Sequence, residues 1–124
     1  MKADCKPIDI RERAFDFAVR VVRLCRYLDE KPGVGRTLGK QLLRAGTSVG
    51  ANVEEAKAGQ SRADFISKNA IALKEARETS YWLRLLAASD VLDEARVADL
   101  RVEAEELTRI LAAIIVSAKK HDAS

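Results

Sequence analysis

The sequence predicts an all-α protein, an antiparallel up-down-up-down four-helix bundle formed by residues 1–124 as a single domain. The composition supports this prediction, because the 124 residues include only two prolines and many alanine, leucine, arginine and glutamate residues. The pattern supports it as well. Apolar residues recur at spacings of three and four in four stretches, and short segments interrupt the pattern between them.

The first helix is expected over residues 9–28. Asp9 is a candidate N-cap, and Glu12 follows it at the capping-box spacing of three residues. The apolar positions cover almost half of the helix surface, which is more than one neighbouring helix needs. These positions are Ile10, Ala14, Phe17, Ala18, Val21, Leu24, Cys25 and Leu28, with Phe15 and Val22 widening the stripe.

A second helix is expected over residues 37–58, after a break that contains Pro32, Gly33 and Gly35. Its core positions are Leu38, Leu42, Ala45, Val49, Val53 and Ala56. Gly59 separates it from a third helix over residues 61–88, where Ser61 and Asp64 repeat the capping-box spacing. The core positions of the third helix are Phe65, Ala72, Ala76 and Leu83.

The fourth helix is expected over residues 93–120 and has the most regular core pattern in the chain. Its apolar positions alternate by three and four, which suits antiparallel packing at a shallow crossing angle. They are Val97, Leu100, Ala104, Leu107, Leu111, Ile114 and Ala118. Lys119 and Lys120 follow them at the end of the helix, where cations are favourable.

A polar stripe borders the core of the second helix. Its members are Gln41, Arg44, Ser48, Asn52 and Glu55, which recur every three or four residues and therefore share one edge. We expect them to form a structural polar network with the third helix. That helix offers Asn69, Arg77 and Ser80 near its core edge, with Glu75 and Glu78 expected elsewhere on its surface as solvated or salt-bridging groups. A ligand or nucleic-acid site is the alternative interpretation of this stripe.

The third helix also carries a second apolar patch, which consists of Ile71, Trp82, Leu85 and Leu86. These residues lie largely opposite its core positions, and one bundle core cannot bury both faces. Exposed apolar patches mark partner surfaces, and tryptophan is a frequent anchor residue. We therefore expect the patch to be a homo-oligomer interface, with a wider core as the alternative.

Three short motifs partly match known catalytic, phosphate-binding or metal-binding patterns, and each one fails a requirement of its pattern. Gly46–Gly50 matches the GxSxG pattern of hydrolases, but Ser48 lies in a predicted helix and the one histidine, His121, is in the terminal tail. The glycines before Lys40 lack the spacing of a phosphate-binding loop. The chain also lacks the Glu-x-x-His pairs of a helical metal site. We predict no catalytic, cofactor or metal site, and no enzyme.

Positive charge is concentrated in the first half of the chain. Residues 1–52 contain eleven basic and six acidic side chains, whereas residues 53–124 contain eleven and thirteen. The first helix carries its basic residues on the side opposite the apolar stripe: Arg13, Arg20, Arg23 and Arg26. This face predicts contact with the phosphates of RNA or DNA, and a solvated surface is the alternative.

The segment from Leu38 to Leu86 resembles the bacterial four-helix-bundle family of 23S rRNA intervening-sequence proteins. The resemblance rests on a family pattern that matches Arg44, Ala45, Ser48, Val49, Asn52, Val53 and Glu55. Ala56 follows where many members have glycine, as in one subgroup of the family. Related accessory proteins of diversity-generating retroelements form pentameric rings, bind a reverse transcriptase and are thought to contact nucleic acid. The resemblance therefore implies a ring-shaped homo-oligomer, a pentamer, without enzymatic activity.

Two functions compete at this point. The first is a non-catalytic oligomeric module that binds RNA or DNA through a basic surface, and the second is a protein-interaction scaffold without nucleic-acid binding. The start of the chain has no signal-peptide core, and its longest apolar run, residues 110–116, is far shorter than the roughly 20 residues that span a bilayer. We expect a cytoplasmic protein with no membrane partner.

Overall fold

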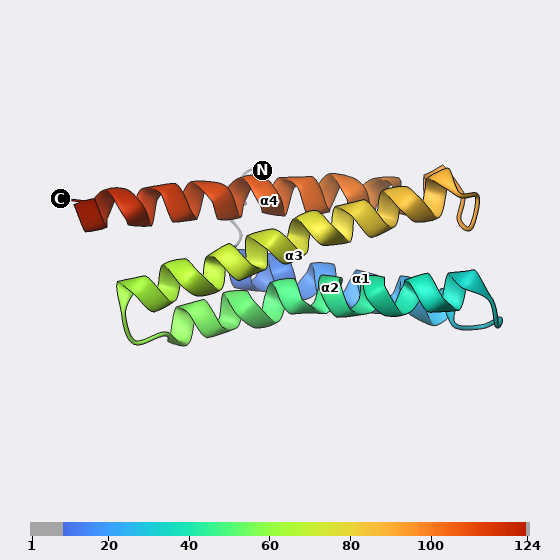
Figure 1. Ribbon diagram of the computed structural model, residues 1–124, viewed down its shortest axis with the longest axis horizontal. Helices are drawn as coiled ribbons and strands as arrows, with labels where there is room; N and C mark the ends of the chain where they lie inside the picture. Colours follow the sequence, from blue (N-terminus) through green and yellow to red (C-terminus); the bar gives the residue numbers. More distant parts are fainter. Residues whose placement is uncertain (1–8, 124) are drawn as a thin grey trace, which may run out of the picture.

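The computed structural model describes residues 9–123, and within this range it contains four α-helices and no strand (Figure 1). The helices are α1 (Ile10–Leu28), α2 (Val34–Ala58), α3 (Arg62–Ala88) and α4 (Glu94–Ala123). The all-α class and the four predicted helices are confirmed. None of the helices in the described range is long and apolar enough to cross a membrane.

The helices pack in a cycle in which each one contacts the next, and α4 contacts α1. Within residues 9–123, the backbones of the diagonal pairs α1–α3 and α2–α4 do not approach each other closely, and only their side chains meet in the core. The α1–α4 pair has the smallest contact of the four. Figure 1 shows the chain turning back at each of its three connections, so the loops before α2 and before α4 lie at one end of the bundle.

The helix starts follow local capping. The Asp9 carboxylate accepts a hydrogen bond from the Arg11 backbone N–H at 2.9 Å, and the Ser61 hydroxyl accepts one from the Asp64 N–H at 3.0 Å. The second helix begins at Val34, three residues before the predicted start. Gly33 precedes it with φ of +135°, a conformation that favours glycine, so the turn is complete earlier than the sequence pattern indicates.

The core lies along the bundle axis and is built from the predicted stripes. Its larger part surrounds Phe17, and a smaller part rich in alanine surrounds Leu111. Two predicted members of the α1 stripe are on the surface instead: Phe15 is 64% exposed and Val22 is 37% exposed. Phe15 follows the buried Ala14, and one residue turns about 100° around a helix, which takes its side chain out of the core. On α4, Ile115 is buried where Ile114 was expected.

The helices α1 and α2 approach each other closely at two glycines. A methyl group on Gly46 would lie 2.7 Å from a Val21 Cγ atom, and one on Gly50 would lie 3.4 Å from the Ala14 carbonyl oxygen. These are the two glycines of the GxSxG pattern. Ser48 lies between them and donates its hydroxyl to the Arg44 carbonyl within the helix. The pattern therefore serves helix packing in this fold.

Candidate nucleic-acid interface

The four arginines predicted to contact nucleic acid do not form a single surface. Arg13 lies between α1 and α4 and makes a two-pronged salt bridge, with Nε 2.7 Å and Nη2 3.0 Å from the Glu103 carboxylate oxygens. Both side chains are partly buried, and the hydrogen bond to Glu103 raises the pKa of Arg13. The charge of Arg13 is therefore compensated within the bundle, and the prediction that grouped it with a free basic face was wrong.

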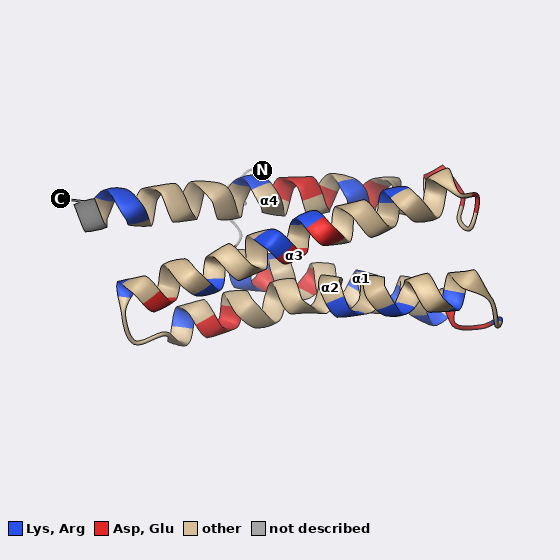
Figure 2. Ribbon diagram, viewed as in Figure 1, with Lys and Arg blue, Asp and Glu red and all other residues tan. Residues whose placement is uncertain are grey.

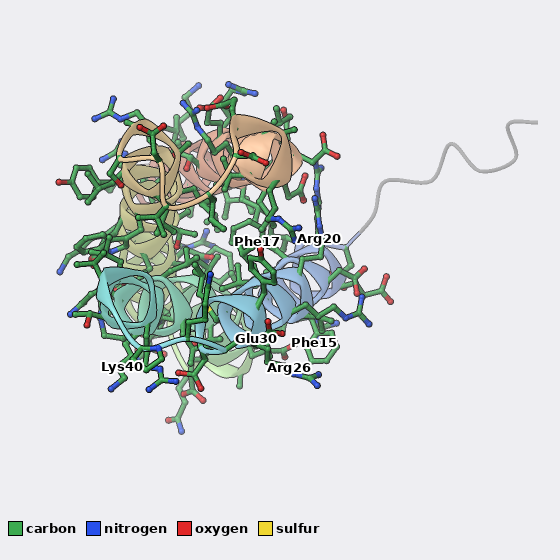
Figure 3. The ribbon with its side chains drawn as sticks, turned by 90° about the vertical axis from the view of Figure 1, so that its right-hand side faces the viewer. Phe15, Phe17, Arg20, Arg26, Glu30 and Lys40 are labelled. Carbon is green, nitrogen blue, oxygen red and sulfur yellow. The ribbon has the colours of Figure 1, made fainter. Side chains whose placement is uncertain are left out.

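Arg20, Arg23 and Arg26 have no ion-pair partner within residues 9–123. Figure 3 shows Arg20 and Arg26 on opposite sides of α1. Arg20 and Arg23 border the α1–α4 groove, whereas Arg26 borders a hollow between α1 and α2. The basic surface consequently wraps around the second half of α1 instead of occupying one face.

The α1–α4 groove has a volume of about 330 Å³ and contains a cation–aromatic pair. The Arg96 guanidinium of α4 lies 4.1 Å from the ring centroid of Tyr27 on α1. Arg96 adds a third cation beside Arg20 and Arg23, with Asp99 as the acidic residue among them. Sequence analysis missed Arg96, because the register of α4 against α1 is not visible in a helix pattern.

The polar network between α2 and α3 depends on one residue of the predicted stripe. Arg44 bridges Glu75, at 3.2 Å, and Glu78. Glu78 also accepts a hydrogen bond from Trp82 Nε1 at 3.0 Å. These two glutamates were expected elsewhere on the α3 surface, but they form the salt bridges that connect α3 to Arg44 of α2.

The other members of the stripe do not connect the two helices. Ser48 and Asn52 donate hydrogen bonds to carbonyl groups of α2 itself. Gln41 and Glu55 are exposed, and their side chains have no hydrogen-bond partner in the described part of the chain. On α3, the buried Asn69 also bonds within its own helix, to the Phe65 carbonyl at 3.0 Å.

The second apolar patch of α3 is smaller than the sequence indicates. Leu86 is fully buried in the core of its own chain, so it cannot contact another copy, and the prediction was wrong for this residue. Trp82 is half-buried and packs against the same core, and Leu85 is half-buried. Ile71 is the most exposed member. The buried face of α3 is therefore wider than the apolar stripe that the sequence predicted.

The described residues were also compared with the requirements of metal ligands and reactive thiols. The part of the chain that the structure describes contains no cluster of three or more histidine, cysteine, aspartate or glutamate side chains suited to a metal ion. Cys25 is buried, its thiol donates to the Gly39 carbonyl at 3.3 Å, and burial raises its pKa to about 11. A thiol in this state is a poor nucleophile at neutral pH.

Comparison with known proteins connects the chain to one protein family. The family model described as 23S rRNA-intervening sequence protein matches residues 6–113. The fold is similar to a crystal structure of a protein of unknown function from the S23 ribosomal protein family, from Bacteroides thetaiotaomicron, with a TM-score of 0.80. The two chains are 41% identical over 86% of this chain and 98% of the other. No curated protein matches the chain.

Proposed function

The chain belongs to the family of 23S rRNA-intervening sequence proteins, and from this premise we propose that it is a non-catalytic module that binds RNA or DNA through the basic surface of α1. The observation that supports this most is that Arg20 and Arg23, which have no ion-pair partner within residues 9–123, border one groove together with Arg96. Other arginines of the bundle, such as Arg13 and Arg44, are paired with glutamates. Unpaired arginines on one helix are ready to exchange their counterions for phosphates.

The chemistry of this surface favours the nucleic-acid backbone over the bases. Guanidinium groups form two-pronged hydrogen bonds with phosphate oxygens. Figure 2 shows blue segments along the second half of α1. Tyr27 offers one exposed ring, but its face is already covered by Arg96. We therefore expect binding that depends steeply on salt and little on sequence.

The proposal contains no catalytic step. Ser48, the candidate nucleophile, donates its hydroxyl proton to a backbone carbonyl of its own helix, and the described residues provide no histidine beside it. The proposal includes a homo-oligomer, because several copies would multiply the basic surface. A protein-interaction scaffold is the competing function, supported by the exposed apolar side chains of α1 and α2.

Titration of fluorescent single-stranded RNA and duplex DNA with the purified protein, across a series of salt concentrations, tests the proposal. We expect Arg20→Glu/Arg23→Glu to weaken binding by about tenfold or more at low salt and to flatten the salt dependence. The matched control is Arg77→Glu/Arg84→Glu, which changes the net charge equally at exposed positions of α3 that have no ion-pair partner in the described range.

The two variants separate a local site from a general charge effect. Binding that falls only in the α1 variant supports the proposed surface, whereas an equal fall in both variants indicates non-specific attraction. No binding by the wild-type protein at low salt would reject the nucleic-acid function and leave the scaffold function ahead.

A further inference from the structure

The groove between α1 and α4 contains an arginine stacked on a tyrosine. The Arg96 guanidinium of α4 lies over the Tyr27 ring of α1, 4.1 Å from its centroid. A guanidinium is planar, so one of its faces can rest on an aromatic ring while the other face stays available. Arg96 is exposed and has no ion-pair partner within residues 9–123. The guanidinium face turned away from Tyr27 is therefore accessible.

The fold holds this stacked pair at one end of the bundle. Tyr27 is in the last turn of α1, and Arg96 is in the first turn of α4. Leu24 and Leu100 line the same groove, and both belong to the core, with exposed fractions of 8% and 6%. The groove therefore has an apolar floor, and its charged groups lie at the rim.

Cations outnumber acids along this groove. Arg20 and Arg23 line it together with Arg96, and Asp99 is its acidic residue. Neither Arg20 nor Arg23 has an ion-pair partner in the described range. Three arginines and one aspartate leave a local excess of two positive charges. A groove with this excess attracts phosphate groups.

The acidic residues next to the groove do not cancel this excess. Glu103 follows Asp99 by one turn of α4, and it is salt-bridged to Arg13. Asp16 precedes Arg20 by one turn of α1, but it lines a different hollow, which it shares with Arg11. No ion pair joins Asp16 to Arg20 in the described part of the chain.

The groove has room for a planar ring beside a phosphate group. Its volume is about 330 Å³, whereas a cavity of about 150 Å³ holds a benzene ring. Arg20 and Tyr27 are seven residues apart on α1. This spacing places them on the same side of the helix, about 10 Å apart along its axis. Adjacent parts of one nucleotide chain can therefore reach the arginines and the stacked pair together.

We propose that the α1–α4 groove binds an unpaired nucleotide of a single strand. Its base stacks on the outer face of the Arg96 guanidinium, and the neighbouring phosphates contact Arg20 and Arg23. Guanidinium planes are stacking partners of bases that have left a helical stack. Tyr27 is a positioning residue, because it supports the guanidinium from the other side.

This inference rests on the proposed nucleic-acid function and narrows its ligand to single strands. In a duplex, the faces of each base are covered by the neighbouring base pairs, so a duplex offers only its phosphates to the groove. The stack is tolerant of sequence, since every base has a flat face. RNA and DNA strands share this chemistry, because the stack does not contact the sugar.

A strand without bases separates stacking from phosphate contact. The purified protein is titrated with a short fluorescent single-stranded DNA and with a strand of equal length in which every nucleotide is abasic. Both strands carry the same number of phosphates. We expect the abasic strand to bind about tenfold more weakly, with an unchanged dependence on salt. Equal affinity for the two strands would overturn the stack and leave the phosphate contacts in place.

Substitution of Tyr27 tests the support of the guanidinium. Tyr27→Leu leaves the charge unchanged and should weaken binding of the normal strand by about fivefold or more, without affecting the abasic strand. Tyr27→Phe should bind like the wild type, since the stack uses the ring and not the hydroxyl. The matched control is Tyr81→Leu on α3, because Tyr27 and Tyr81 are 45% and 48% exposed. An equal loss on both strands would overturn the positioning role of Tyr27.

Substitution of Arg96 tests the stacking plane itself. Arg96→Lys keeps the charge but removes the plane, so it should abolish the preference for the normal strand over the abasic strand and keep the dependence on salt. Arg84→Lys, at an exposed position of α3, is the matched control. Duplex DNA should bind both Arg96→Lys and the wild type equally. Weaker duplex binding by Arg96→Lys would overturn the assignment of this residue to an unpaired base.

An RNA strand of the same sequence is titrated in parallel. Tyr27→Leu should weaken its binding by the same factor as that of DNA, and a loss confined to one sugar would overturn stacking as the shared contact. These measurements also distinguish the two levels of the argument. If the wild type binds no strand at low salt, the nucleic-acid function itself fails. If it binds strands with and without bases equally, only the stacking inference fails.

Discussion

Single residues decide how closely α1 and α2 pack. The small residues from Gly46 to Gly50 could be assigned to close helix packing from the sequence, because a serine within a helix cannot act as a nucleophile elbow. The sequence did not show that the two glycines differ. A methyl group at Gly46 would overlap the buried Val21 side chain, whereas one at Gly50 would make an ordinary contact with Ala14.

We therefore predict opposite effects for alanine at the two glycines. Gly46→Ala should lower the free energy of unfolding by about 1 kcal/mol, since overpacking costs more than the gain in helix propensity. Gly50→Ala should raise it by up to about 1 kcal/mol, because only the gain in propensity applies. Urea unfolding at one fixed protein concentration measures both, so that any association contributes equally to the two variants. Equal stabilisation by both substitutions would contradict the close approach at Gly46.

At the scale of the helices, the starts are predictable where a side chain caps the backbone. Asp9 and Ser61 were identified from their spacing to acidic residues, and both accept a backbone hydrogen bond at the helix start. Ser61 accepts from Asp64, as the capping box predicts, whereas Asp9 accepts from Arg11 instead of Glu12. The start of α2 was missed by three residues, because Gly33 ends the turn through its backbone conformation and provides no capping side chain. The sequence pattern therefore locates a helix start where a side chain caps the helix, and it misses a start that a backbone turn determines.

The cap of α1 predicts a pH dependence. The Arg11 N–H and guanidinium hydrogen-bond to the Asp9 carboxylate and lower its pKa below the usual 3.8. Asp9→Asn keeps a capping side chain but removes the titrating group. Because the folded pKa is depressed, the stability that the charged Asp9 contributes is present above the unfolded pKa and is lost as the pH falls through the folded value.

Thermal unfolding of wild type and Asp9→Asn between about pH 2 and pH 7 measures this contribution. The wild-type protein should have the higher midpoint at neutral pH, and the difference should close in the acid range. A difference that stays constant with pH would show that the carboxylate charge does not stabilise the cap.

The whole molecule shows why the basic surface was only partly predictable. A helical projection of α1 correctly placed its arginines away from the core, but it contained no information about the neighbouring helices. The register of α4 brings Glu103 to Arg13, which compensates the charge of that arginine, and brings Arg96 to Tyr27, which adds another cation to the surface. Both changes arise from residues that lie far apart in the chain, on its first and last helices.

The proposed homo-oligomer leads to a prediction about affinity. In an assembly of several copies, a long RNA strand can contact Arg20 and Arg23 of more than one copy, whereas a short strand reaches only one copy. The slope of log affinity against log salt counts the phosphates that are neutralised. We therefore expect a steeper slope for long RNA than for a short strand.

The short strand serves as the internal control for damage to the arginine surface, because Arg20→Glu/Arg23→Glu should weaken the binding of both strands by removing the same groove cations. Equal slopes for long and short RNA would mean that the copies do not share one strand, so assembly would not increase the number of phosphates bound.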